Sequence, residues 1–240
     1  MNKFLFLDFD GVLFDTVDEA YEVCINTKMF KNNTFTQDSL NVFRKNRYLV
    51  GPAWNYYYIM QSLMSENVIN HTEFILTDEV KSFEIDFFNT RKQLKLDYKN
   101  WLMLNKPYDF LFKLEKIISY AKELNVYIIT TKDKQTVIDL LNSYNINCIK
   151  YENILGKDMF DNFLSKHNII KHILLENTDE YDAIFIDDLY EHLVGCKNIE
   201  SLELLQPNWG YINAHSKLQY LCNIEQILEK IHLLIGKTDE

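Results

Sequence analysis

Short apolar runs separated by longer amphipathic stretches set the pattern of this chain. Three runs predict buried strands, at Phe4–Asp8, Val126–Thr130 and Ala183–Asp187. Apolar runs of this length, rich in aromatic and β-branched residues, are typical of strands covered on both faces. Two weaker candidates are Cys148–Lys150 and Leu202–Leu205.

Helical patterns lie between these strands. After Pro107, apolar residues recur at i, i+3 and i+4 spacing as far as Ala121, which predicts a helix that begins near the proline. Similar patterns predict helices over Asp133–Tyr144, Phe163–Leu175 and Ile224–Leu234. Because short buried strands alternate with helices, we expect an α/β fold with a parallel sheet.

The stretch from about Val17 to Leu104 has a different pattern, with helical periodicity and no convincing strand. It predicts helices over Val17–Phe30 and Pro52–Met64, and one long helix or two over Asp78–Leu104. We therefore expect an α/β core made of residues 1–16 and 105–240, with an all-helical insert over residues 17–104.

Composition and charge exclude several classes of protein. The chain has 240 residues, of which 47% are apolar, and its formal net charge is −10. No apolar run approaches the roughly 18 residues of a membrane span, so we expect a cytoplasmic protein with no membrane partner. The acidic balance argues against nucleic-acid binding. The four cysteines lack paired spacing and are expected to be reduced, and the six histidines show no ligand spacing, so none is given a role.

Candidate chemistry starts at the end of the first strand, in the sequence Asp8-Phe9-Asp10-Gly11. Ligands of open parallel sheets bind beyond the carboxyl ends of the strands. Asp8 could act there as a nucleophile and Asp10 as a general acid and base, and such hard oxygen ligands suit Mg²⁺. The alternative is that the two acids only terminate the strand.

The sequence DFDGVLFDT, from Asp8 to Thr16, resembles the first motif of the haloacid dehalogenase superfamily, in particular its helical-capped phosphatases. The resemblance is to phosphoglycolate phosphatase-like members with a C1-type cap. It implies a Rossmann-like parallel core with a helical cap inserted after the first strand. It also implies three further motifs downstream.

The second and third motifs of the family have counterparts in order. Thr130 ends the second strand, where the resemblance implies a hydroxyl that donates to a phosphoryl oxygen, with Thr131 beside it as a candidate substrate contact. The alternative is that Thr130 caps the next helix. For the family's lysine we prefer Lys166 over Lys157, because Lys166 precedes a helical pattern.

Paired acids at the end of the third strand, Asp187 and Asp188, resemble the family's metal-binding motif. Two buried like charges without a cation would be unfavourable, which supports this interpretation. The further acid that usually follows is absent. Glu191 is the candidate substitute for it.

By resemblance, Asp8 attacks phosphorus to form an aspartyl-phosphate, and Asp10 protonates the leaving oxygen and then activates water. Mg²⁺ would be held by Asp8, the Asp10 backbone carbonyl, Asp187 and Asp188. The predicted function is a Mg²⁺-dependent phosphatase, monomeric or homodimeric, acting on a small phosphorylated substrate. The alternatives are a phosphomutase and a non-catalytic phosphate-binding or regulatory relative.

The insert contains one basic cluster, which includes Arg44 and Arg47. These arginines are candidate contacts for an anionic substrate. The alternative is that they lie on a solvated face.

Overall fold

The computed structural model describes residues 2–65, 74–176 and 180–236. The chain divides into two compact units, one formed by Met1–Asp15 and Pro107–Glu240 and the other by Thr16–Lys106. Each unit is described by itself.

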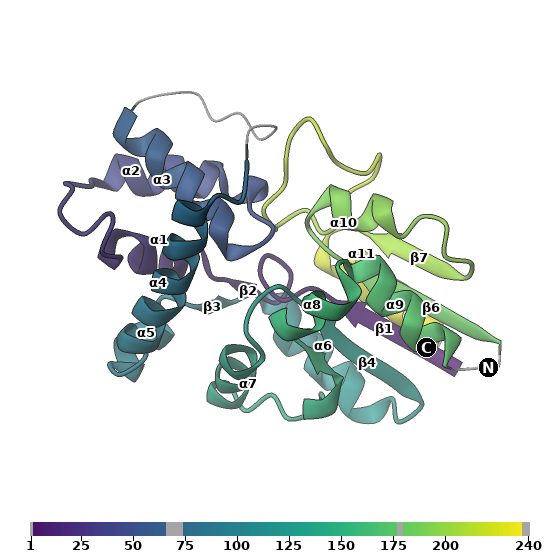
Figure 1. Cartoon of the computed structure of the whole chain (residues 1–240). Coiled ribbons are helices and arrows are strands. Elements are labelled where there is room, and N and C mark those ends of the chain that lie inside the picture. The colour runs from purple at the N-terminus through teal and green to yellow at the C-terminus, as the bar shows by residue number, and fades with distance from the viewer. Residues whose placement is uncertain (1, 66–73, 177–179, 237–240) are drawn as a thin grey trace. The chain divides into compact units, whose positions relative to one another are not determined.

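The first unit is built on a five-stranded sheet in the order β5-β4-β1-β6-β7, and all of its neighbouring strands are parallel (Figure 1). The bounds of the strands are β1 Asn2–Leu7, β4 Leu124–Ile129, β5 Ile154–Leu155, β6 Tyr181–Ile186 and β7 Leu202–Leu205. The predicted α/β fold class with a parallel sheet is confirmed. A separate two-stranded sheet joins β2 (Phe14–Asp15) to β3 (Lys106–Pro107), where the chain leaves and re-enters this unit.

The weak strand prediction at Cys148–Lys150 is wrong. The strand beside β4 is β5, at Ile154–Leu155, and Lys150 instead precedes the short 3-10 helix Tyr151–Asn153. A run of three residues carries too little periodicity to distinguish a strand from a loop that packs an apolar side chain. Ile149 is such a residue, because it is buried without belonging to a strand.

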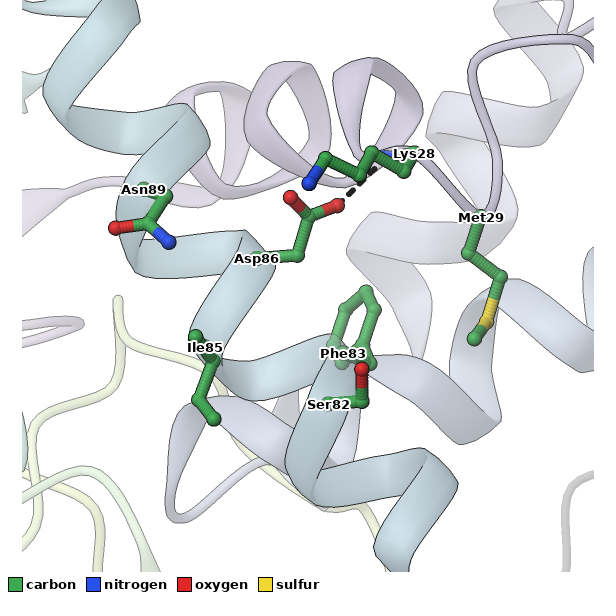
Figure 2. Close-up of a pocket in the computed structure, with 7 residues that line it drawn as sticks. All are labelled: Lys28, Met29, Ser82, Phe83, Ile85, Asp86 and Asn89. Carbon is green, nitrogen blue, oxygen red and sulfur yellow. Dashed lines mark hydrogen bonds between the residues drawn. The ribbon is translucent and has the colours of Figure 1, made fainter.

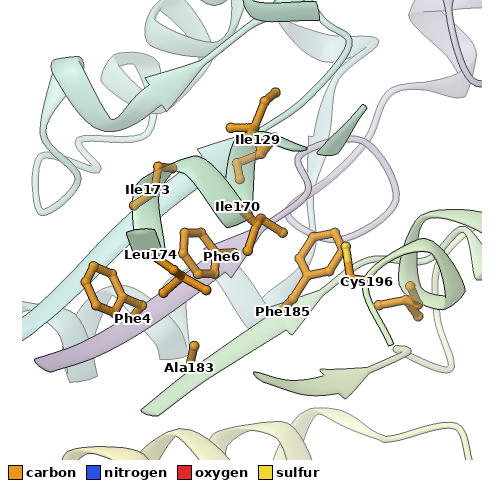
Figure 3. Packing of buried hydrophobic residues seen from close by; sticks show 11 residues of the cluster. Phe4, Phe6, Ile129, Ile170, Ile173, Leu174, Ala183, Phe185 and Cys196 are labelled. Atoms are coloured by element: carbon orange, nitrogen blue, oxygen red, sulfur yellow. The ribbon is translucent and has the colours of Figure 1, made fainter. Parts of the chain in front are cut away.

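Helices cover both faces of the sheet. Successive strand residues point to opposite faces, so Phe4 and Phe6 of β1 face one side while Leu5 and Leu7 face the other. Helix α9 (Lys166–Leu175) packs Ile170, among others, against Phe4 and Phe6, in a cluster that also contains Phe185 and Cys196 (Figure 3). Helices α6 and α11 pack together, and α11 contacts β1 and β6. The remaining bounds in this unit are α6 Asp109–Tyr120, α7 Lys134–Ser143, α8 Phe160–Phe163, α10 Tyr190–Gly195, α11 Ile224–Ile235 and the 3-10 helix Lys157–Met159.

In the second unit, the described secondary structure is helical, except for Lys106, which belongs to β3. Its elements are α1 Val17–Asn26, α2 Gln37–Lys45, α3 Tyr56–Ser65, α4 Asp78–Leu94, α5 Tyr98–Met103 and the 3-10 helices Arg47–Leu49 and Ala53–Asn55. Helix α1 ends before the predicted Phe30, because Thr27 leaves the helical conformation and its hydroxyl donates to the Cys24 carbonyl. Helix α2 was not predicted, since its residues are mostly polar and Phe43 is the one that it buries.

A buried ion pair links three helices of the second unit. The Arg91 guanidinium of α4 donates from Nε and Nη2 to the two carboxylate oxygens of Glu19 in α1, at 2.7 and 2.9 Å. Trp101 of α5 donates from its indole nitrogen to the same carboxylate. The carboxylate therefore receives three hydrogen bonds, which offset the cost of burying its charge.

The structure shows no helix, within its described ranges, that is both long and apolar enough to cross a membrane. All four cysteines are free, and Cys24 and Cys196 are buried. Burial raises the pKa of the Cys196 thiol to about 12, so this side chain packs as a neutral apolar group.

Removing the buried arginine is expected to destabilise the second unit. We expect Arg91→Met to lower the free energy of unfolding by about 3–5 kcal/mol, because it leaves the Glu19 carboxylate buried without its cation. Urea denaturation followed by circular dichroism would measure this loss. Lys81→Met is the matched control, since Lys81 pairs with Asp78 at the exposed surface and should have little effect. Equal losses in the two variants would contradict the prediction.

Candidate active site

The parallel register brings the chemical groups to one edge of the sheet. Leu7, the last residue of β1, pairs with Ile186, the last residue of β6, so Asp8 and Asp187 follow at the same level. The Asp8 amide continues the ladder by donating to the Ile186 carbonyl at 2.9 Å. Thr130 follows β4 on the other side of β1 and is buried. The carboxyl ends of three neighbouring strands thus present two carboxylates and a hydroxyl together.

Lys166 joins the two carboxylates. It is the first residue of α9, and its ammonium Nζ lies 2.8 Å from Asp8 Oδ1 and 2.7 Å from Asp187 Oδ2. Lys166 is 3% exposed, Asp8 6% and Asp187 0%, so water screens this group poorly. Of the two candidate lysines, Lys166 contacts both acids. Lys157 lies in a short 3-10 helix, and its amide donates to the Lys132 carbonyl.

The shared ammonium acts differently on the pKa values of its two acid partners. Burial raises the pKa of Asp8, Lys166 lowers it and Asp187 raises it, and the net direction is upward. Burial also acts to raise the pKa of Asp187, but Lys166 and His192 lower it to about 2. For Lys166, burial lowers the pKa of the ammonium, while Asp187 and Asp8 raise it to a net increase. Asp187 is therefore the firmly ionised partner of Lys166, and Asp8 is the more basic carboxylate.

His192, for which no role was expected, also belongs to this group. Its Nδ1 lies 3.0 Å from Asp187 Oδ2. Ligand atoms of Asp8, Asp187 and His192 all lie within 4.8 Å of one another. Glu191, the expected substitute for the missing acid, is exposed instead. His71 lies outside the described residues.

Asp10 has a lysine neighbour of its own, Lys132, whose role the sequence did not reveal. The buried ammonium of Lys132 lies 3.1 and 3.4 Å from the two carboxylate oxygens of Asp10. The Lys132 amide donates to the Thr130 hydroxyl oxygen at 3.2 Å, which turns the chain at the end of β4. Helix α7 is capped by Asp133, whose side chain accepts from the Thr136 amide, so the capping role considered for Thr130 belongs to Asp133. Thr131 is partly exposed between these residues.

Asp188 is buried between two glycines. The Tyr211 amide donates to its Oδ2 at 2.6 Å, and a Cβ on Gly11 would lie 2.1 Å from the same oxygen. A Cβ on Gly210 would lie 2.4 Å from the Asp188 Cβ and 2.6 Å from the Gly11 carbonyl oxygen. Gly11 also has a φ of +87°, which disfavours any other residue. Asp188 therefore packs the first motif against the loop after β7.

That loop is fixed to the first motif by two further contacts. The Trp209 indole donates to the Val12 carbonyl at 3.2 Å, and the Tyr211 hydroxyl lies 2.8 Å from Asp15 Oδ1. Gln206, which is fully buried, donates from its side-chain amide nitrogen, Nε2, to the Asp188 backbone carbonyl. No motif in the sequence marks these three residues, because their role depends on a loop conformation.

The two arginines proposed as substrate contacts have partners within the second unit. Arg44 donates to Asp18 at 2.6 Å. Arg47 is buried, donates to the Val50 carbonyl at 2.9 Å and lies over the Tyr56 ring. Their role in substrate binding stays a prediction.

Two surface pockets lie elsewhere in the two units. A pocket of about 350 Å³ in the second unit lies between the end of α1 and α4, where Asp86 accepts a hydrogen bond from the Lys28 amide (Figure 2). A pocket of about 480 Å³ in the first unit is lined by the starts of β6 and β7 and by α11. The starts of these strands lie at the edge of the sheet opposite to Asp8 and Asp187.

Solved structures with the same fold cover almost the whole chain. A predicted phosphatase from Clostridium acetobutylicum is 18% identical, with a TM-score of 0.65 over 97% of this chain and 99% of that one. A predicted phosphoglycolate phosphatase from Haemophilus somnus is 15% identical, with a TM-score of 0.67 over 96% and 98%. A haloacid dehalogenase-like hydrolase from Streptococcus pneumoniae is 17% identical, with a TM-score of 0.61 over 96% and 98%.

No family model and no curated protein matches the sequence. At such low identity, the structural likeness establishes the fold alone. The haloacid dehalogenase-like fold implied by the first motif is thereby confirmed.

The packing around Asp188 predicts a position-specific effect of one methyl group. We expect Gly210→Ala to lower the free energy of unfolding by about 1–3 kcal/mol, because the new Cβ overlaps Asp188 and the Gly11 carbonyl. Gly195→Ala is the matched control, since a Cβ there meets nothing within 4 Å. Urea denaturation of both variants would measure the difference, and an unchanged stability for Gly210→Ala would refute the packing argument.

The shared ammonium predicts a pH-dependent loss of stability. We expect Lys166→Met to lose about 3–5 kcal/mol at about pH 7, because two buried carboxylates then face each other without a cation. Without Lys166 the pKa values of Asp8 and Asp187 rise, so the carboxylates become protonated on mild acidification and the deficit relative to the unmodified protein shrinks towards about pH 5. Urea midpoints measured across this range test the trend. A deficit that grows as the pH falls would contradict it.

Proposed function

We propose that this chain, which has the haloacid dehalogenase-like fold, is a phosphatase that hydrolyses a small phosphate monoester through an aspartyl-phosphate on Asp8. The observation that carries the proposal is the contact of one buried ammonium, Lys166, with both Asp8 and Asp187 at the carboxyl edge of the sheet. Phosphoryl transfer depends on positioning and charge stabilisation, and this cluster offers both.

Asp8 is the proposed nucleophile. Its Oδ1 accepts hydrogen bonds from the Phe9 amide and the Lys166 ammonium, at 2.7 and 2.8 Å, which fix the orientation of the carboxylate. The bond from a carboxylate oxygen to phosphorus forms as the bond to the leaving oxygen breaks. Hydrolysis of the resulting acyl phosphate by water then regenerates Asp8 and releases inorganic phosphate.

Asp10 is the proposed general acid and base. Two residues beyond Asp8, it would donate a proton to the leaving oxygen and later accept one from the attacking water. Lys132 contacts both of its carboxylate oxygens and so restricts the position of this group. The same ammonium is available to attract a phosphoryl oxygen, together with Lys166.

Thr130 is the proposed neutral donor to the phosphoryl group. Its hydroxyl oxygen already accepts from the Lys132 amide, so its own proton can be donated to a different oxygen. Thr131 is proposed as a further substrate contact, and Arg44 and Arg47 stay candidates for the rest of the substrate.

The donors present suit a divalent cation, which we propose as a cofactor with Mg²⁺ as the expected ion. Asp8 and Asp187 supply carboxylate oxygens close enough together to share one ion, with His192 beside them. When bound, the cation would neutralise negative charge on the transferring phosphoryl group. Further proposed ligands are the Asp10 backbone carbonyl, from the first motif, and Asp188, from the paired acids after β6.

Replacing the nucleophile tests the proposal directly. We expect Asp8→Asn to lower phosphate release by about 10³-fold or more, because an amide oxygen cannot form the covalent intermediate. The assay is release of inorganic phosphate from a broad panel of phosphate monoesters, with Mg²⁺ and at matched protein concentration. Asp161→Asn, at an exposed position, is the control and should keep full activity.

The products of the reaction decide between hydrolysis and other outcomes. Phosphate release that persists in Asp8→Asn would overturn the role of Asp8. Isomerised phosphate ester in place of free phosphate would reassign the protein as a mutase. No turnover of any ester by a protein that folds normally would overturn the enzymatic proposal.

A further inference from the structure

We propose that the imidazole of His192 is a direct ligand of the divalent cation at Asp8 and Asp187, and that the site consequently prefers Mn²⁺ or Co²⁺ to Mg²⁺. This inference builds on the cation site of the proposed function and changes its expected metal. The sequence resemblance implied an acid near this place in the chain, and the structure puts a nitrogen donor there.

The distances suit a shared ion. With metal–ligand bonds of about 2.1 Å, neighbouring donors of an octahedral ion lie about 3 Å apart and opposite donors about 4.2 Å apart. His192 Nδ1 and Asp187 Oδ2 are separated by 3.0 Å, as two neighbouring ligands would be. The third donor atom, on Asp8, lies within 4.8 Å of both. Only a small adjustment is needed to bring the three donors onto one ion.

The local fold holds His192 in this position. The Asp187 Oδ1 oxygen accepts from the Leu189 amide at 2.8 Å, which turns the chain directly after β6. The Leu189 carbonyl then accepts from the His192 amide at 3.2 Å at the start of α10. The same carboxylate thus fixes the turn with one oxygen and faces the imidazole with the other. The next residue, Leu193, is fully buried and anchors the helix.

Lys166 and His192 contact the same carboxylate, that of Asp187, but differ in their access to solvent. Lys166 is 2% exposed in its side chain, whereas the His192 side chain is 24% exposed, so a cation can reach the imidazole from solvent. An oxygen of Asp187 can accept from the ammonium with one lone pair and bind a metal with the other. Without the cation, the side chains of Asp8, Asp187 and Lys166 carry a net charge of −1, and a neutral imidazole ligand adds no charge to this total.

This donor set changes the metal preference. Mg²⁺ is bound in proteins through oxygen ligands and gains most from carboxylate charge. Imidazole nitrogen favours first-row transition metals, whose affinities rise from Mn²⁺ to Co²⁺ and beyond. Replacing an expected carboxylate by an imidazole removes one negative charge, which weakens the binding of Mg²⁺, and adds a softer nitrogen donor, which offsets this loss for transition metals.

The test is a spectrum of the metal-loaded protein, measured on the whole 240-residue chain. With Mn²⁺ bound, electron spin-echo envelope modulation should show coupling to a histidine ¹⁴N nucleus, replaced by a ¹⁵N signal after histidine labelling. The coupling should disappear in His192→Asp and persist in His172→Ala, where the histidine is half exposed and pairs with Glu176. In calorimetric titrations, His192→Asp should lower the ratio of Mn²⁺ to Mg²⁺ affinity by about tenfold or more.

The outcomes separate this inference from the proposed function. Absence of nitrogen coupling in the unmodified protein, or an unchanged affinity ratio in His192→Asp, would overturn the metal assignment even if phosphate release is robust. His192→Ala removes the imidazole without adding a carboxylate that could itself bind the cation, and it should also lose the nitrogen coupling. Conversely, nitrogen coupling in a protein that releases no phosphate would support this inference and overturn the phosphatase.

Discussion

The central constraint of this structure is the buried ammonium of Lys166 between two carboxylates. Asp8 and Asp187 follow paired strands and cannot avoid each other, because the parallel register sets them at the same level. The Lys166 ammonium offsets the repulsion between the two carboxylates, and Lys166 also begins α9, the helix that packs on the sheet. The position of α9 is thus tied to the electrostatics of the site as well as to its own apolar face, and a shift of this helix would separate the charges.

The two acids that contact Lys166 differ in their pKa values. Asp187 receives hydrogen bonds from the Leu189 amide and from Lys166 and contacts His192, and its low pKa follows from these contacts. Asp8 is bound by fewer donors and is the more basic acid, as suits the role of nucleophile proposed for it. Two carboxylates of identical intrinsic chemistry are differentiated by their neighbours.

The sequence predicted what depends on local pattern and missed what depends on loop conformation. The three central strands follow from continuous apolar runs, and Lys166 was found because it precedes a recognisable helical pattern. The short apolar run at Cys148–Lys150 was wrongly predicted as a strand, and the polar helix α2 lacks the apolar periodicity that would have predicted it. His192 had only its place five residues after Asp187 to mark it, and Lys132, which follows Thr130 and Thr131 in the second motif, was given no role. Tyr211 acts through a backbone amide, which no side-chain pattern can reveal.

The central position of β1 has a consequence for biosynthesis. Its partners, β4 and β6, begin at Leu124 and Tyr181, so β1 is synthesised more than a hundred residues before either of its neighbours in the sheet. At about 5–20 residues per second, translation reaches β4 on the order of 10 s later. During that interval the whole of the second unit, Thr16–Lys106, is synthesised. Until β4 is made, the apolar segment Phe4–Leu7 lacks both of the strands that flank it in the finished sheet.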